Sequence, residues 1–178
     1  MTHLFKTYQP FCKLWFQVLH HLGKDEPDQL NVLTQTLKEA RRVIKPNGVL
    51  SISTVLPESF KHLWYCHIIP GLNERFAKVM PSIPQLENVF EESGFNCVQK
   101  LNCLGLALIS DYNNYEGLLD DAWRSVCSYW SRATEQELEE AKAFIRDLKA
   151  RGELEAWCKE RDSLQTEGHL TLIFCKTK

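Results

Sequence analysis

The sequence has no closely paired cysteines and no closely paired glycines. The seven cysteines are Cys12, Cys66, Cys97, Cys103, Cys127, Cys158 and Cys175. They are widely spaced and include no C-x-x-C pair, whereas disulfide frameworks and structural zinc sites normally show paired spacing. We therefore expect reduced thiols and no metal site. The eight glycines are isolated and form no G-x-G, so the sequence offers no glycine-rich turn that would bring backbone close to a phosphate-bearing ligand.

An excess of one charge and a membrane-length apolar run are also missing. The chain carries 21 basic and 23 acidic residues, a formal net charge of −2, which gives no electrostatic reason to expect nucleic acid or an anionic membrane as a partner. The apolar segment FCKLWFQVL is interrupted by Lys13 and Gln17 and is too short to span a bilayer. We expect a cytoplasmic protein, and 178 residues suit one domain.

A helix, a turn and a strand follow one another over residues 30–56. The apolar residues of this helix recur at spacings of three and four, which places them on one face: Leu30, Leu33, Leu37, Ala40 and Ile44. Asp25 and Pro27 suit its start. Pro46-Asn47-Gly48 stops the helix, and the β-branched run VLSISTVL follows. A helix that leads directly into such a run is half of a βαβ unit.

Further elements follow from local patterns, and one of them is ambiguous. Residues 11–22 (FCKLWFQVLHHL) have helical spacing but also a compact apolar run that suits a buried strand. The remaining predictions are a helix over 59–80 broken at Pro70-Gly71, a capping box at Ser82–Gln85 starting a helix, a strand over 95–109 broken near Gly105, a capping box at Thr134–Glu137 starting a second helix, and a terminal strand in HLTLIFCK. The layout is α/β.

Four blocks in this order resemble a known family. They are FQVLHHL (16–22), LKEARRVIKPNGVLSIS (37–53), LENVFEESGF (86–95) and GHLTLIFCK (168–176). They resemble the C-terminal half of class I S-adenosylmethionine-dependent methyltransferases, and most closely the methyltransferase type 11 or UbiE-like group. Ile44 stands where that family usually has Leu, and Asn47 stands for the first Gly of a pair. Asn is the non-glycine residue that best tolerates a left-handed backbone conformation, so this exchange is conservative.

The resemblance implies a partial fold. It predicts a Rossmann-like methyltransferase sheet made of strands four to seven of the family fold, with flanking helices. The family's N-terminal half, which holds most of the cofactor with a glycine-rich turn and an acidic residue, has no counterpart in this sequence. We therefore expect a single truncated domain over residues 1–178, with an aromatic helical insertion at about 59–80 and a second helical insertion at about 118–160.

The resemblance also points to candidate cofactor-binding residues. Phe16, Gln17, Val18, Leu19, His20 and His21 match the end of the family's fourth strand, beside the methionine end of S-adenosylmethionine. Ligands of open α/β sheets lie at the carboxyl ends of strands, so the position is sensible. The two histidines suit a polar pair at a helix start equally well. Adjacent histidines point in different directions, so they do not make a metal site.

Candidate substrate-binding residues lie in the two insertions. Trp64, Tyr65 and Arg75 lie in the first, Trp123 lies in the second, and all occupy regions where such methyltransferases cover the methyl acceptor. They could line an apolar acceptor pocket or could be packing residues, and packing is the better interpretation for most of them. Methyl transfer needs little beyond alignment of the reacting atoms, so no catalytic base is assigned.

Two functional hypotheses follow. In the first, the chain is methyltransferase-like, and its parent activity transfers a methyl group from S-adenosylmethionine to a small molecule. The missing half would leave this chain with weak cofactor binding or none. In the second, the chain is a non-catalytic interaction module. The strand at 14–19 would then be an exposed sheet edge, which could pair with a partner, an intact homologue or a second copy.

Overall fold

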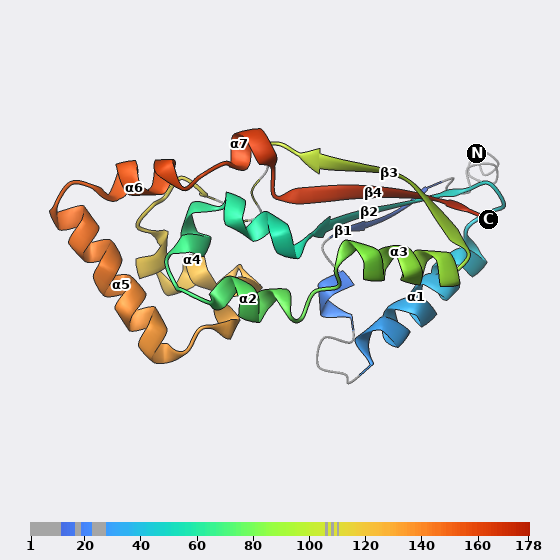
Figure 1. Cartoon of the computed structure of the whole chain (residues 1–178), viewed down its shortest axis with the longest axis horizontal. Helices are drawn as coiled ribbons and strands as arrows, with labels where there is room; N and C mark the ends of the chain where they lie inside the picture. The colour runs from blue at the N-terminus through green and yellow to red at the C-terminus, as the bar shows by residue number, and fades with distance from the viewer. Residues whose placement is uncertain (1–11, 17–18, 23–27, 106, 108, 110) are drawn as a thin grey trace, which may run out of the picture. The chain divides into compact units, whose positions relative to one another are not determined.

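The computed structural model describes residues 12–16, 19–22, 28–105, 107, 109 and 111–178 (Figure 1). Contacts divide the chain into two compact units. Unit 1 contains Met1–Thr54, Pro81–Leu101 and Thr171–Lys178, and unit 2 contains Val55–Met80 and Asn102–Leu170. Both segments predicted as insertions therefore fall in unit 2.

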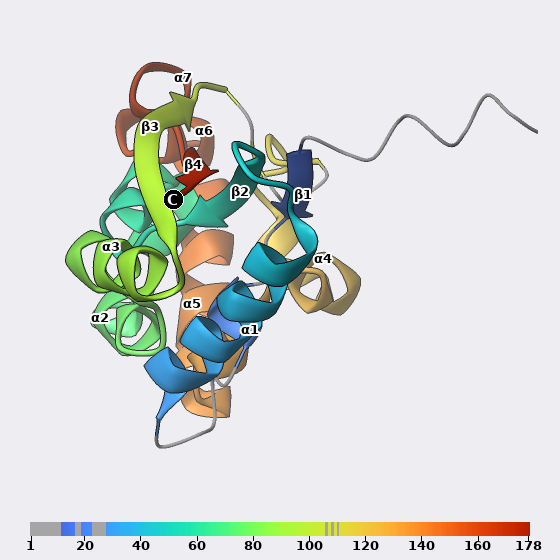
Figure 2. The ribbon, with the colours of Figure 1, turned by 90° about the vertical axis from the view of Figure 1, so that its right-hand side faces the viewer.

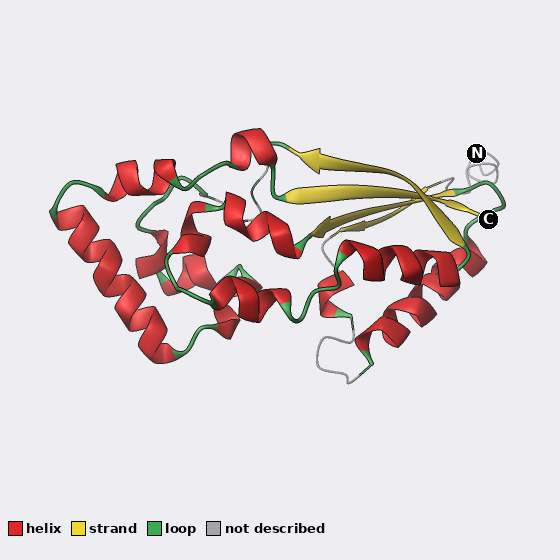
Figure 3. Cartoon of the chain, in the orientation of Figure 1, coloured by secondary structure: helices red, strands yellow, loops and turns green. Residues whose placement is uncertain are grey.

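A four-stranded sheet lies in unit 1, and the ends of three of its strands belong to unit 2. Its strands are β1 (Cys12–Phe16), β2 (Val49–Val55), β3 (Phe95–Cys103) and β4 (Leu170–Thr177), in the order β1-β2-β4-β3. β1 and β2 are parallel, with Cys12 opposite Val49 and Phe16 opposite Ser53. The C-terminal strand β4 runs against both of its neighbours (Figures 1 and 3). The end of β4 accordingly bonds to the residues before β2 and β3, from Thr177 N–H to the Gly48 carbonyl and from Lys178 N–H to the Gly94 carbonyl.

Helices α1 (Gln29–Val43) and α3 (Ile83–Glu92) lie side by side against one face of this sheet (Figure 2). A short 3₁₀ helix, η1 (Leu19–His21), follows β1. The Ser93 hydroxyl at the end of α3 lies between the two helices, 2.7 Å from the Val89 carbonyl of α3 and 3.2 Å from the Thr34 carbonyl of α1. Apolar side chains of α1, α3 and the sheet form the core of unit 1, among them Leu33, Leu37, Leu50, Ile52, Leu86, Phe90 and Ile173.

Unit 2 is helical apart from the ends of three strands (Figure 3). Its α-helices are α2 (Leu72–Ala77), α4 (Asp121–Ser125), α5 (Glu135–Ala150), α6 (Leu154–Glu160) and α7 (Leu164–Glu167). Its 3₁₀ helices are η2 (Pro57–His62), η3 (Trp64–His67), η4 (Gly117–Leu119) and η5 (Ser128–Arg132). Aromatic residues from several of these short elements make up much of its core.

Several local predictions are confirmed. Residues 30–44 form helix α1 except for Ile44, which caps it, and VLSISTV forms β2. Both capping boxes are present, at Ser82–Gln85 before α3 and at Thr134–Glu137 before α5. Asn47 has a φ of 62°, a left-handed conformation, which agrees with the interpretation of Asn as a conservative replacement for Gly. The ambiguous segment 11–22 begins as a strand, and the structure describes all of it except residues 11, 17 and 18.

Three predicted boundaries are wrong. Helix α1 takes its N-cap from Asp28, whose carboxylate accepts from Asn31 N–H at 3.3 Å; Asp25 and Pro27 lie outside the described residues. Residues 59–80 do not form one broken helix, because Leu63 is extended between η2 and η3. The strand predicted over 95–109 ends at Cys103, since Gly105 turns with a φ of 68° and donates instead to the Leu164 carbonyl at 3.0 Å.

Candidate functional site

The cofactor-binding residues were predicted at the carboxyl ends of the parallel strands β1 and β2. Because the two strands are parallel and paired through Phe16 and Ser53, the chain leaves both of them at the same edge of the sheet. After β1 the chain turns into η1, where Leu19 is buried and His21 is exposed. Gln17 and Val18 lie outside the described residues. The structure thus places Phe16 and Leu19–His21 at the edge of the sheet that binds ligands in α/β proteins.

Three of the predicted substrate-binding residues pack into the core of unit 2. Trp64, Tyr65 and Trp123 are almost fully buried. Their rings contact one another, with centroids 5.7 Å apart for Trp64 and Tyr65 and 5.8 Å apart for Tyr65 and Trp123. The indole N–H of Trp64 donates to the Tyr112 carbonyl at 3.1 Å, so its polar atom is satisfied within the protein. This burial agrees with the packing interpretation, and a direct contact with substrate stays a prediction.

The fourth predicted substrate-binding residue, Arg75, forms an ion pair with Glu137. One terminal nitrogen of its guanidinium contacts both carboxylate oxygens of Glu137, at 2.7 and 2.8 Å. The hydrogen bond from Thr134 N–H, followed by the bond from Arg75, lowers the pKa of Glu137. Glu137 therefore stays ionised while it caps α5 and holds Arg75 of α2. Arg75 thus has a structural partner that sequence reasoning did not identify.

A polar cluster of two serines and two histidines is a further feature of unit 2. The Ser59 hydroxyl donates to the Leu56 carbonyl at 2.8 Å and lies 3.4 Å from Nδ1 of His169. Because the single Ser59 proton is used, we infer that His169 Nδ1 carries the hydrogen of that second bond. Burial lowers the pKa of His169 to about 4, so the imidazole is neutral at physiological pH. His62 Nδ1 bonds the Ser163 hydroxyl at 2.8 Å.

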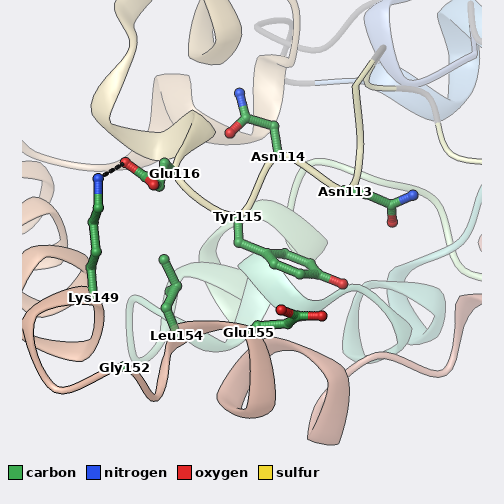
Figure 4. A pocket seen from close by; sticks show the side chains of 8 residues that line it. All are labelled: Asn113, Asn114, Tyr115, Glu116, Lys149, Gly152, Leu154 and Glu155. Atoms are coloured by element: carbon green, nitrogen blue, oxygen red, sulfur yellow. Dashed lines mark hydrogen bonds and ion pairs between the residues drawn. The ribbon is translucent and has the colours of Figure 1, made fainter.

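Unit 2 also contains a cavity of about 400 Å³ that the sequence did not reveal (Figure 4). Its lining residues are Asn113, Asn114, Tyr115, Glu116, Lys149, Gly152, Leu154 and Glu155. The Glu116–Lys149 ion pair, at 2.6 Å, lies on one side, and the Tyr115 ring packs edge-on against Trp64 with centroids 5.4 Å apart. Burial raises the pKa of Tyr115, so its hydroxyl is a hydrogen-bond donor at neutral pH. The lining can bind a small polar molecule through amides, a hydroxyl and charged groups.

A second cavity of about 380 Å³ lies between α1 and α3 in unit 1, and its lining includes Asp28, Lys38, Gln85 and Glu92. Among the described residues, no group of three or more His, Cys, Asp or Glu side chains is placed to hold a metal ion. Within the same residues, no helix combines the length and the apolar character needed to cross a membrane.

Comparison with solved structures shows a methyltransferase-like fold. A presumed methyltransferase from an antibiotic biosynthesis pathway of Anabaena variabilis superposes with a TM-score of 0.70 and 17% identity, over 94% of this chain and 66% of that one. A presumed sarcosine dimethylglycine methyltransferase from Galdieria sulphuraria gives a TM-score of 0.42 and 18% identity, over 93% of this chain and 52% of that one. This chain thus spans about two thirds of the length of the first protein and half of the second. No protein-family model and no curated protein sequence matches the chain.

Proposed function

We propose that this chain is a methyltransferase-like protein whose parent activity transfers a methyl group from S-adenosylmethionine to a small molecule. The fold shared with the Anabaena protein over 94% of the chain supports the class of protein. The observation that carries the cofactor proposal is the parallel pairing of β1 with β2, followed directly by η1. In this proposal β1, β2, β3 and β4 are the fourth to seventh strands of the family sheet.

The residues present fit one part of the cofactor. The end of β1 and η1 would hold the methionine end, with Leu19 anchoring η1 in the core and His21 exposed beside it. S-adenosylmethionine supplies an electrophilic methyl group on a sulfonium sulfur. The contribution of this chain is to position that end and to exclude water, because alignment of the reacting atoms provides much of the rate enhancement. The sequence contains no G-x-G turn for the remaining part.

The methyl acceptor in this proposal is a small molecule. The acceptor region would be held in shape by the packed side chains of Trp64, Tyr65 and Trp123, which are almost fully buried. The ion pair of Arg75 with Glu137 ties α2 to the start of α5 within that scaffold. No general base is required of these residues, since a correctly aligned nucleophile can attack the methyl carbon directly.

The cofactor position is tested by NMR. Adding S-adenosylhomocysteine to isotopically labelled chain should shift the backbone amide signals of Leu19, His20 and His21 in a saturable manner. Amides of α5, such as that of Ile145 in the core of unit 2, serve as the internal control and should keep their positions. Saturable shifts confined to other regions, with the η1 signals unchanged, would show that the predicted site is not the cofactor site.

A second candidate function is suggested by the position of β1. Within the described part of the chain, β1 has one neighbouring strand, β2, and stands at the end of the sheet order. An edge strand presents unpaired backbone N–H and C=O groups that can pair with another chain. The chain would then act as a non-catalytic module, and β1 would receive a strand from a partner, an intact homologue or a second copy.

Two proline substitutions test this candidate. Successive residues of a strand direct their backbone N–H groups to opposite sides. Of Lys13 and Leu14, one therefore directs its N–H toward β2 and the other directs its N–H away from the sheet. Proline has no backbone N–H, so Lys13→Pro and Leu14→Pro each remove one of these two groups. If the edge mediates self-association, sedimentation velocity should show dimers of the unmodified chain, and the substitution at the outward position should dissociate them without loss of helical circular dichroism. A chain that stays monomeric at all concentrations would exclude the second-copy form of this candidate.

A further inference from the structure

Cys97 on β3 and Cys175 on β4 occupy directly opposed positions of neighbouring antiparallel strands. The register follows from the hydrogen bond of 2.9 Å that Lys178 N–H donates to the Gly94 carbonyl. Along an antiparallel pair, residue numbers rise on one strand while the numbers of the opposed residues fall on the other. Stepping inward from Gly94 opposite Lys178 therefore brings Phe95 opposite Thr177 and then, two residues further, Cys97 opposite Cys175.

The other end of the same pair of strands supports this register. A Cβ atom placed on Gly168 would lie 2.7 Å from the Cys103 carbonyl oxygen, and the Asn102 amide donates to the Glu167 carbonyl at 3.3 Å. The first contact falls within one residue of the position that the register predicts, and the second is made by the Asn102 side chain to the end of α7, next to the start of β4. The two ends thus agree, with Cys97 and Cys175 between them.

Opposed pairs in such a ladder alternate between hydrogen-bonded and non-hydrogen-bonded positions. Because Gly94 and Lys178 are a hydrogen-bonded position, Cys97 and Cys175 fall at a non-hydrogen-bonded one. There the Cα atoms of opposed residues are about 4.5 Å apart and the side chains lie on the same face of the sheet. A disulfide requires a Cα separation of about 4.4–6.8 Å, so the backbone need not move to allow one.

The two thiols differ in their surroundings. Cys175 is fully buried, whereas Cys97 is half-buried and reachable from solvent. Burial raises the pKa of the Cys175 thiol well above its usual range, and the adjacent Cys97 thiol raises that pKa further through charge interaction and a side-chain hydrogen bond. This interaction between the two side chains agrees with the opposed positions of Cys97 and Cys175 in the ladder. Cys97 is therefore the thiol that an oxidant meets first.

We propose that Cys97 and Cys175 form a reversible redox-modification site, a cross-strand dithiol that small disulfides such as oxidised glutathione convert to a disulfide. The Cys97 thiolate attacks one sulfur of the small disulfide, forms a mixed disulfide and releases one small thiolate. Cys175 then loses its proton and attacks the Cys97 sulfur, which releases the second small thiolate. Two protein thiols are oxidised, one small disulfide is reduced to two thiols, and β3 becomes covalently linked to β4.

The test uses the full chain. It is incubated with oxidised glutathione, its remaining thiols are alkylated, and it is digested without reduction for mass spectrometry. We expect a peptide pair linked through Cys97 and Cys175 that has lost two hydrogen atoms and that dithiothreitol separates. The linked fraction should form faster at higher pH, because the second step requires the Cys175 thiolate.

Matched variants make the result specific. Cys103 lies on the same strand as Cys97, six residues away, so Cys103→Ser should keep the link between Cys97 and Cys175. Cys97→Ser and Cys97→Ala should lose this link and leave Cys175 as a free thiol. The oxidised chain should also melt at a higher temperature than the reduced chain, and Cys97→Ser should abolish that difference. Cys97 recovered as a stable glutathione adduct, linked to another cysteine or unmodified would overturn the proposal.

Discussion

His169 is a buried neutral imidazole that couples the stability of unit 2 to pH. It is packed edge-on against the Phe60 ring, with centroids 5.6 Å apart, and bonded to Ser59. Burial, with a smaller contribution from the neighbouring His62, lowers its pKa from 6.5 to about 4 in the folded chain, although the hydrogen bond with Ser59 opposes this shift. Between these two values the unfolded chain binds more protons than the folded chain. The stability contribution is therefore fully present above pH 6.5 and is lost as the pH falls toward 4.

This coupling predicts the behaviour of His169→Asn, which keeps a donor near Ser59 and cannot titrate. The unmodified chain should lose on the order of 3 kcal/mol of unfolding free energy between neutral pH and pH 4 through this residue. Urea unfolding at a series of pH values should show a smaller loss for His169→Asn. The matched control His67→Asn, at an exposed histidine, should retain the steep dependence. Identical pH profiles for His169→Asn and the unmodified chain would contradict the assignment.

At the residue scale, the sequence predicts what depends on neighbours along the chain. Ser82 with Gln85 and Thr134 with Glu137 are visible as capping boxes, because each pair bonds within one turn. The neutral state of His169 is not visible, since it depends on burial in the folded chain, where its hydrogen-bond partner Ser59 is 110 residues away. The cavity beside Tyr115 likewise combines residues 113–116 with residues 149–155, and no local pattern joins these segments.

The turn between α7 and β4 depends on a glycine that no other residue can replace easily. Gly168 has φ 76° and ψ 168°, and an added Cβ would lie 2.7 Å from the Cys103 backbone oxygen. Gly168→Ala should therefore cost more than the ~1–3 kcal/mol that a strained backbone conformation alone costs. Gly152→Ala is the matched control, because φ there is 71° and nothing lies within 4 Å of the added atom. Thermal unfolding that ranks Gly152→Ala as the more harmful change would refute this explanation.

At the element scale, single helices and strands are better predicted than their pairing. The end of α1, the start of α3 and the extent of β2 follow from periodicity, turns and caps, and Leu33, Leu37 and Leu50 face the core as that periodicity predicts. The position of β4 between β2 and β3 is not predicted by local patterns. The end of β4, near Thr177, pairs with residues near Gly48 and Gly94, which are far away in the sequence. Residues 57–67 form 3₁₀ turns, since close aromatic packing of Trp64 and Tyr65 overrides their helical pattern.

At the scale of the whole molecule, the α/β class and the methyltransferase-like fold could be inferred from four short blocks in the correct order. The superposition on the Anabaena protein at 17% identity supports that fold. The organisation into two units was not inferred, because the segments of unit 2 come from two separate parts of the sequence. The aromatic residues Trp64, Tyr65 and Trp123 lie in the core of unit 2, in agreement with the packing interpretation, and their contact with an acceptor stays a prediction.

The central proposal is that the carboxyl edge of β1 and β2 binds the methionine end of S-adenosylmethionine. The most direct measurement is calorimetric titration of the purified chain with S-adenosylmethionine and S-adenosylhomocysteine, after circular dichroism has shown that the sample is folded. The proposal predicts saturable heat with a micromolar dissociation constant, a binding free energy on the order of −8 kcal/mol. A folded sample that gives no detectable heat with either compound would contradict it and favour the interaction-module candidate.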